Sequence, residues 1–272
     1  TIYNQDVTAL TDWINTLQVP FQDAAFFNFI ASHDGIGVMP AKGLLTDADI
    51  QNLVDQSILH GGDASYKTNS DGTRSVYELN ITLFDGLNNP ADRDQELSLN
   101  RFLASQAIML SLAGVPGIYV HSLFGSHNCH ACREESGRAR SLNREKFDLH
   151  QLQAEIHDPD NIHARVFQEY KHLLLIRKEN NVFHPSAPQK VIKLQNQVFA
   201  LMRYSLDNME QVLCLINISP EAQLIDIELS NLDWQGALSL EDCISGERFI
   251  TRDTRVQFTM TAYQTLWLSP QF

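Results

Sequence analysis

The sequence predicts an α/β region followed by an all-β domain, and two observations carry this prediction. Up to about residue 181, helical and strand-like apolar patterns alternate along the chain, which is typical of parallel strands joined by crossover helices. From about residue 182 onward the helical patterns stop and short β-rich runs follow. We therefore divide the chain into residues 1–182 and 183–272, and expect the second part to be a small antiparallel β-sandwich.

Four segments of the first region show the apolar spacing of amphipathic helices. The second begins with a Thr/Asp cap and closes on glycines, and the fourth carries basic residues in its last turns, as helix ends commonly do. In chain order, the four predicted helices are "VTALTDWINTL", "TDADIQNLVDQSILHGG", "RDQELSLNRFLASQAIMLSLAG" and "HARVFQEYKHLLLIRKEN".

Two continuous apolar runs, "AAFFNFIAS" and "VPGIYVHSLFG", predict buried strands. Between them, "GGDASYKTNSDGTRS" is rich in Gly, Ser, Asn and Asp and predicts a long loop, a kind of segment that often carries function. Two strands are too few for a closed barrel or a doubly wound sheet, which need about five to eight. We therefore expect the α/β region to be incomplete.

The strands expected in the sandwich are separated by turns such as "LDN", "SPE" and "SGE". They are alternating or β-rich runs: "QKVIKLQ", "QVFALMRYS", "EQVLCLINIS", "AQLIDIELS", "ALSLEDCIS" and "TAYQTLWLS".

The composition excludes several partners. The 272 residues carry a formal net charge of −13 at pH 7, which argues against binding to nucleic acid or to an anionic membrane surface. No apolar run approaches the ~18 residues that span a bilayer. Four cysteines in a chain of this length favour a reducing, cytoplasmic compartment. The start, "TIYNQDVTALTDWINTLQ", lacks signal-peptide features, so we expect the chain to begin inside a longer protein.

The run "NFIASHDGIGVMP" ends its apolar stretch on His33 and Asp34. Active sites of α/β folds lie at the carboxyl ends of parallel strands, which makes this pair a candidate site. Asp-Gly is also a common turn signal, so a simple chain reversal at Asp34 and Gly35 is an equal alternative. A metal phosphohydrolase with a His-Asp pair is a third alternative, but it needs further spaced histidines that we cannot place.

The segment "HNCHACREESGRARSLNREKFD", residues 127–148, supports two hypotheses. Its cysteines and histidines crowd into one loop and suggest zinc, but a second CxxC pair is missing, so we expect no metal and no other cofactor there. Its arginines, Arg138, Arg140 and Arg144, suit bidentate binding of carboxylates, phosphates or sugar hydroxyls. The alternative is a solvated basic loop that balances the neighbouring glutamates.

The segment "RSVYELNITLFDGL", residues 74–87, follows the predicted polar loop. Tyr77 and Glu78 are placed to face a ligand, or the segment is merely the return to the next helix. The apolar residues expected to pack are Leu79, Ile81, Leu83 and Phe84.

Taken together, these motifs resemble the sucrose phosphorylase group of the alpha-amylase clan. "ASHDGIGVMP" is similar to the group's seventh-strand motif, "LAGVPGIYV" to the clan's eighth strand, and "GRARSLNREKFD" to the group's Gly-Arg and Asn-Arg loop. "YKHLLLIRKEN" resembles the last barrel helix, and the β-rich runs after it resemble the clan's C-terminal β domain. The resemblance implies the C-terminal part of a (β/α)8 barrel, about strands seven and eight, followed by a β domain.

The resemblance also implies roles for single residues. Asp34 would stabilise the transition state by binding hydroxyls of the glucose ring, and His33 would bind the same sugar. Arg140 matches the family's sugar-contacting arginine, with Arg138 as a rival, and Arg144 would support the same loop.

On the acceptor side, Tyr77 matches a tyrosine of the family's mobile loop. Arg74 and Ser75 depart from the pattern of strict sucrose phosphorylases. Arg74 would suit a phosphorylated or acidic acceptor, such as a sugar phosphate or glycerate.

The activity implied for the parent protein is that of a retaining sugar phosphorylase, which moves a glucosyl unit from an α-glucoside to phosphate without metal or organic cofactor. Motifs for the nucleophile and the acid/base are not found, so this chain by itself is expected to be inactive. The alternatives are an α-glucosidase or transglycosidase of the same clan, or a non-catalytic carbohydrate-binding module. A partial barrel would expose apolar surface, which favours a homo-oligomer.

Overall fold

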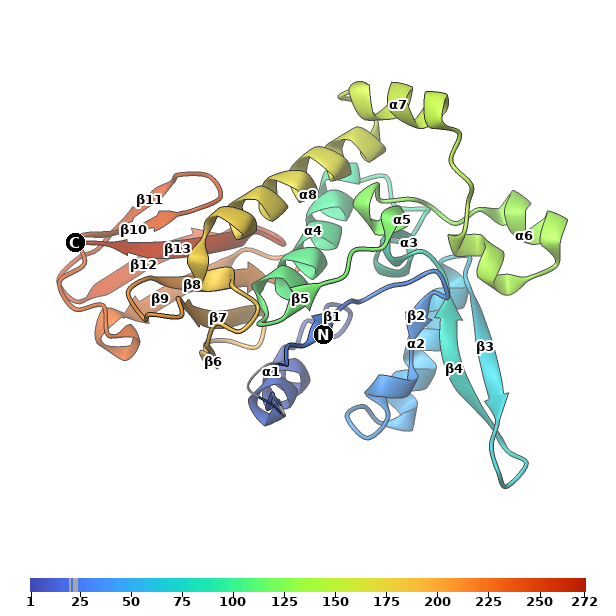
Figure 1. Ribbon diagram of the computed structural model, residues 1–272, viewed down its shortest axis with the longest axis horizontal. Helices are drawn as coiled ribbons and strands as arrows, with labels where there is room; N and C mark the ends of the chain where they lie inside the picture. Colours follow the sequence, from blue (N-terminus) through green and yellow to red (C-terminus); the bar gives the residue numbers. More distant parts are fainter. Residues whose placement is uncertain (20, 22–23) are drawn as a thin grey trace. The chain divides into compact units, whose positions relative to one another are not determined.

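Figure 1 shows the computed structural model of the chain, which describes residues 1–19, 21 and 24–272. The chain forms two compact units, each assembled from separate stretches of sequence. The first, here called the sandwich unit, consists of Thr1–Asn28, Leu103–Pro116 and Lys171–Phe272. The second, the hairpin unit, consists of Phe29–Phe102 and Gly117–Tyr170. The boundary between residues 182 and 183 stays a prediction.

The sandwich unit contains the expected antiparallel β domain. A six-stranded sheet has the order β11-β10-β13-β8-β7-β6, and β12 pairs with β9. Apolar side chains of both sheets, among them Ile225 and Leu268, form one buried core. The strands are β6 (Gln189–Val191), β7 (Val198–Tyr204), β8 (Gln211–Asn217), β9 (Gln223–Glu228), β10 (Ser239–Asp242), β11 (Arg248–Ile250), β12 (Arg255–Met260) and β13 (Thr265–Gln271).

All six strands predicted for this domain are present, but β11 and β12 were not predicted. β11 is three residues long, follows a turn at Gly246 and begins with a charged residue. Its sequence therefore continues the polar pattern of the turn and gives no separate strand signal. β12 buries Val256 and Met260 between exposed polar residues, which is the pattern of a strand with one face in solvent.

The two buried strands predicted for the α/β region are much shorter than expected. β1 (Phe27–Asn28) and β5 (Val115–Pro116) form a parallel pair, and Phe27 is 65% exposed. Pro116 has no N–H to donate to a ladder, and β5 ends there. The rest of the predicted second strand contains helix α5 (Val120–Leu123) instead.

The four predicted helices are present. They are α1 (Thr8–Thr16), α2 (Asp47–Leu59), α4 (Gln95–Ser111) and α8 (Ile162–Glu179). Thr46 caps α2 as expected: its side chain accepts from the Asp49 N–H, and the Asp49 carboxylate accepts from the Thr46 N–H. Among the residues that the structure describes, no helix combines the length and apolarity needed to cross a bilayer.

The prediction of a long loop after α2 is wrong, because most of this segment forms a β-hairpin. β3 (Asp63–Thr68) and β4 (Arg74–Asn80) pair antiparallel, and β2 (Ile36–Gly37) adds to the other edge of β4. The polar residues that suggested a loop lie in the tight turn or along the two strands, where they are exposed or half-buried. Helix α2 packs on this sheet through Ile50 and Val54.

The segment after β4 is buried, and short helices and turns make up the rest of the hairpin unit. Leu79, Ile81, Leu83 and Phe84 are buried as predicted. The short helices are α3 (Leu83–Leu87), α6 (His130–Ser136) and α7 (Leu149–His157), and 3-10 turns lie at η1 (Met39–Ala41) and η2 (Ala139–Asn143). Two further 3-10 turns, η3 (Asn181–Phe183) and η4 (Leu229–Leu232), belong to the sandwich unit.

The His-Asp motif lies in a tight turn that glycine makes possible. Ser32 and Gly35 exchange backbone hydrogen bonds of 3.1 and 3.0 Å, and Gly35 has φ +117°. A Cβ on Gly35 would lie 2.1 Å from the carbonyl oxygen of Leu79 on β4. The absence of a side chain therefore lets the turn rest directly on the strand.

Replacing Gly35 with alanine should strongly destabilise the chain, because strand backbone cannot retreat from the added Cβ. We expect the free energy of unfolding, from urea titration, to fall by about 2 kcal/mol or more. Gly37→Ala is the matched control, since a Cβ there would first meet Pro40 Cδ at 3.9 Å. Equal losses in the two variants would contradict the close packing of this turn.

Candidate functional site

The carboxylate of Asp34 lies between two guanidinium groups. Arg144 Nη2 donates to Asp34 Oδ1 at 2.7 Å, and Arg140 Nη1 lies 3.1 Å from the same oxygen. Arg144 Nε also donates to the carbonyl of His33 at 2.6 Å, while His33 Nε2 lies 3.4 Å from Asp34. The structure thus brings together four residues that the sequence assigned to the site.

Glu78 holds Arg140 in a bidentate ion pair. Arg140 Nε and Nη2 donate to the two carboxylate oxygens of Glu78 at 2.6 and 2.9 Å. The hydrogen bond with Glu78 raises the pKa of Arg140. The Glu78 side chain is 4% exposed, so it turns toward the arginine and away from solvent. Glu78 therefore positions Arg140. The sequence had instead suggested that Glu78 faces a ligand.

Two further polar residues, which the sequence did not single out, complete this network. Asn80 Nδ2 donates to Glu78 Oε1 at 2.8 Å, and Ser65 Oγ on β3 donates to Asn80 Oδ1 at 2.7 Å. Glu78 and Asn80 lie two positions apart on β4, so their side chains share one face of the strand. Two polar residues with this spacing inside a buried run are the signal that could have indicated the network.

The segment that carries the arginines, residues 138–144, is here called the arginine loop. Asn143 Nδ2 donates to the carbonyl of Ser32 at 2.9 Å, and Tyr119 Oη donates to the carbonyl of Asn143 at 2.6 Å. The loop is therefore tied to the His-Asp turn by a side-chain amide as well as by Arg144.

Beside these ion pairs lies an open pocket of about 730 Å³. Its lining consists of the arginines and the three serine hydroxyl groups of the surrounding elements, with one alanine: Ser65, Ser136, Arg138, Ala139, Arg140, Ser141 and Arg144. The guanidinium of Arg138 has no ion-pair partner among the residues that the structure describes, whereas those of Arg140 and Arg144 are occupied. The pocket thus offers one uncompensated cation beside three serine hydroxyl groups.

The two acceptor-side candidates lie on β4. Tyr77 is next to Glu78 and is 42% exposed. Arg74 lies at the start of the strand, about 14 Å from Glu78 at the usual rise per residue. Its guanidinium lies over the ring of Tyr66, 5.2 Å from the centroid. The structure therefore places Tyr77 near the network and Arg74 near the hairpin turn.

A second buried carboxylate, Asp85, anchors the segment that leads to the arginine loop. His127 Nδ1 donates to Asp85 Oδ1 at 2.6 Å, and the Asn128 N–H donates to Asp85 Oδ2 at 2.7 Å. The side chain of Asn128 accepts from the Thr82 N–H at 2.9 Å and donates to the carbonyl of His60 at 3.2 Å. The hydrogen bond with Asp85 is the main cause that raises the pKa of His127.

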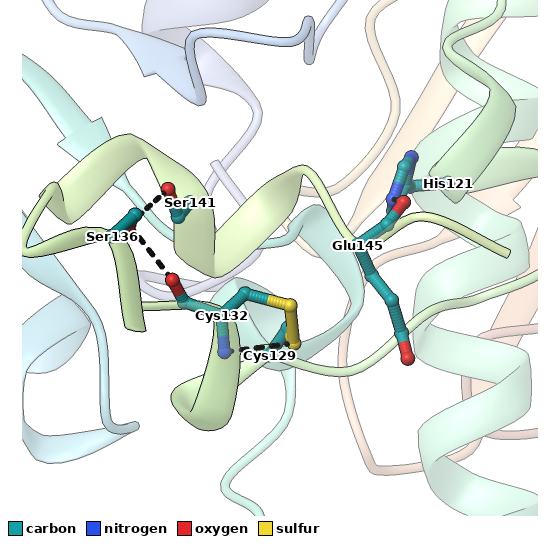
Figure 2. Close-up of a disulfide and its surroundings, with 6 residues drawn as sticks. All are labelled: His121, Cys129, Cys132, Ser136, Ser141 and Glu145. Atoms are coloured by element: carbon teal, nitrogen blue, oxygen red, sulfur yellow. Dashed lines mark hydrogen bonds between the residues drawn. A yellow bond between two sulfur atoms is a disulfide. The ribbon is translucent and has the colours of Figure 1, made fainter. Parts of the chain in front are cut away.

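The cysteines that suggested zinc are joined to each other. Figure 2 shows the disulfide between Cys129 and Cys132, at the start of α6. Among residues 1–19, 21 and 24–272, no group of three or more His, Cys, Asp or Glu residues is arranged to hold a metal ion.

Figure 2 also shows His121, which follows Tyr119 in the chain. The ring of His121 contacts the carbonyl of Glu145 at 3.1 Å, and burial lowers the pKa of His121.

Comparison with known proteins supports the resemblance. The chain is 43% identical to a glucosylglycerate phosphorylase of Allomeiothermus silvanus over 81% of its length, and 37% identical to one of Spirochaeta thermophila over 98%. A glucosylglycerate phosphorylase of Escherichia coli K12 is 33% identical over 98% of the chain. The chain matches the C-terminal part of enzymes of the sucrose phosphorylase group.

The match covers less than half of each phosphorylase: 39%, 46% and 45% of the three relatives, respectively. The fold agrees with a sucrose 6F-phosphate phosphorylase from Thermoanaerobacter thermosaccharolyticum, with a TM-score of 0.66 and 20% identity over 80% of this chain and 41% of that one. No family model matches the chain. The structural likeness identifies the fold as the C-terminal part of a (β/α)8 barrel followed by a β domain, as the sequence predicted.

The His127–Asp85 pair predicts a specific pH dependence of stability. Because folding raises the pKa of His127, the pair adds stability that is complete below the unfolded pKa, about 6.5. This stability is lost as the pH rises through the higher pKa of the folded state. The difference in unfolding free energy between wild type and His127→Gln should therefore shrink between pH 6 and pH 8.5.

Chemical denaturation at several pH values measures this difference. His150→Gln is the control, because His150 is exposed on α7 and should leave the wild-type pH dependence intact. A difference between wild type and His127→Gln that stays constant with pH would contradict the assigned role of Asp85.

Proposed function

We propose that the protein that carries this chain is a retaining sugar phosphorylase. It would transfer a glucosyl unit from an α-glucoside to inorganic phosphate and release glucose 1-phosphate. The observation that carries this proposal is Asp34, held between Arg140 and Arg144 at the edge of a pocket with an uncompensated arginine. The relatives named above support the reaction class.

A fixed carboxylate is useful in glucosyl transfer because the transition state resembles an oxocarbenium ion. Hydrogen bonds from sugar hydroxyls to Asp34 would tighten as positive charge develops on the ring, and His33 would contact the same sugar. The two arginines orient the carboxylate before the sugar arrives. Asp34 thus lowers the barrier without forming a bond to the substrate.

We assign neither the nucleophile nor the acid/base to a residue of this chain. Both roles require a carboxyl group that is available to the glycosidic bond. Glu78 is buried and fully engaged by Arg140 and Asn80, and Asp85 is engaged by His127 and Asn128. Glu78 and Asp85 therefore position neighbouring residues and are not available to the glycosidic bond.

The pocket supports an anionic group on the acceptor side. A phosphorylase must admit phosphate and exclude water from the glucosyl-enzyme, which calls for cationic and hydroxyl donors. Arg138 would supply the charge and Ser136 and Ser141 the hydroxyls, for phosphate or for the carboxylate of a glycerate-like acceptor. Tyr77 and Arg74, on the exposed hairpin, would add contacts to a larger acceptor when the hairpin moves.

Three broader proposals accompany this function. We propose that the enzyme is cytoplasmic and that residues 183–272 form its β domain. We also expect the 272-residue chain by itself to self-associate, since Phe27 and Val115 of the short β1–β5 pair are 65% and 44% exposed.

Steady-state kinetics of the full-length protein tests the function. Asp34→Asn should reduce phosphorolysis and hydrolysis together by a factor of about 10² or more, because both reactions pass through the same transition state. Arg138→Ala should raise the KM for phosphate or for an anionic acceptor about tenfold or more and leave formation of the glucosyl-enzyme intact. Arg74→Ala, at the far end of β4, should have a smaller effect on the same constants.

Initial rates are measured against phosphate and against each acceptor, with free glucose followed in parallel. Glucose release at the same rate with and without phosphate would show a hydrolase instead of a phosphorylase. Unchanged dependence on every anion in Arg138→Ala would remove Arg138 from the acceptor side.

A further inference from the structure

We infer that the Cys129–Cys132 disulfide is a reversible thiol–disulfide exchange site that controls the order of the arginine loop. The exchange and its structural effect are independent of the proposed function. The effect on sugar binding rests on that function.

The two cysteines are built as a pair. They are separated by three positions, and their Cα atoms lie 5.3 Å apart, within the usual range for a disulfide. The two other cysteines of the chain are free and belong to the sandwich unit. Of these, Cys214 is completely buried, and burial raises its pKa to about 12. Cys243 is half-buried, and burial raises its pKa as well. A raised pKa leaves less of the reactive thiolate, so the reactive sulfur chemistry of the chain is expected at Cys129 and Cys132.

The disulfide is accessible to a reductant. Cys129 and Cys132 are both half-buried, and the residues around them, His130, Ala131 and Arg133, are exposed. In a cytoplasmic enzyme, which is the location proposed above, disulfides that persist are usually transient or redox-sensing. A partly exposed Cys-x-x-Cys pair is an arrangement suited to thiol–disulfide exchange.

The step proposed here uses a protein or small-molecule dithiol as the reductant. One thiolate of the dithiol attacks a cysteine sulfur, the Sγ–Sγ bond breaks, and a mixed disulfide forms. The second thiolate then displaces the cysteine and closes the reductant's own disulfide. Two electrons pass from the dithiol to the protein, and both cysteines leave the exchange as thiols after protonation.

Cys129 contacts the arginine loop through its backbone, and Cys132 is linked to the loop through Ser136. The Cys129 N–H donates to the carbonyl of Leu142 at 2.8 Å. On the other side, Ser136 Oγ bonds both to the carbonyl of Cys132 and to Ser141 Oγ at 2.7 Å, as Figure 2 shows. The same hydroxyl accepts from the Arg138 N–H at 3.2 Å. Movement of Cys129 therefore reaches the loop directly, and movement of Cys132 reaches it through Ser136.

The freedom gained on reduction falls on one side of the disulfide. Asn128, before Cys129, is fixed by Asp85, Thr82 and His60 through three hydrogen bonds. By contrast, none of the residues of α6, all of which the structure describes, is buried. A short helix with no buried side chain depends on its covalent and polar tethers. Opening the disulfide should therefore loosen α6 and, through Ser136, the arginine loop.

The first test measures redox state and backbone order in the full-length protein. Differential alkylation and mass spectrometry in a series of dithiothreitol redox buffers should show Cys129 and Cys132 changing together in one two-electron transition. Amide hydrogen exchange over residues 130–144 should speed up at least tenfold on reduction, while exchange over α8 stays unchanged. Cys243→Ser, the control, should keep both responses, and Cys132→Ser should exchange rapidly in either buffer.

The second test measures sugar binding under the same buffers. Reduction of the wild type should raise the KM for the glucosyl donor several-fold, with a smaller change in kcat, and the difference should vanish in Cys132→Ser. If the protein has no phosphorylase activity, the proposed function fails, and the exchange data still decide this proposal. Folded protein that resists reduction, or that is reduced without faster exchange over residues 130–144, would overturn it.

Discussion

The bidentate ion pair between Glu78 and Arg140 is the interaction on which the candidate site depends. A carboxylate as deeply buried as Glu78 is unfavourable unless it is paired and fully hydrogen-bonded. Arg140 and Asn80 meet that requirement, and the register of β4 with Gly37 and Ser65 fixes where Glu78 stands. The sheet therefore determines the position of Arg140, and Arg140 helps to determine the position of Asp34.

The same β4 strand supports the His-Asp motif from the other direction. Gly35 rests against the Leu79 carbonyl, and Asn80 donates to the carbonyl of Asp34 at 3.2 Å. The motif is both a tight turn and part of the candidate site, so the two alternatives that the sequence offered are not exclusive. The turn brings the carboxylate to the arginines, and the carboxylate holds the arginine loop against the turn. Each feature depends on the other.

Local patterns predicted what local physics determines. Four of the helices and six of the β-domain strands follow from apolar spacing and caps, and the hairpin was missed because a polar, half-exposed sheet has the composition of a loop. Most of the site's contacts lie beyond such patterns. His127 and Asp85 are 42 positions apart, and Arg140 and Glu78 are 62 apart. The motifs nominated Asp34 and the arginines, but the pairing that positions them required the fold.

A mutant cycle on the affinity for glucose 1-phosphate tests the central role of this ion pair most directly. If Glu78 acts by holding Arg140, Glu78→Gln in the wild-type background should raise the Kd, measured by calorimetry on the full-length protein, on the order of tenfold. In an Arg140→Ala background, the same substitution should change the Kd by less than about twofold, because no guanidinium remains to be positioned. An equal factor in both backgrounds would contradict the account.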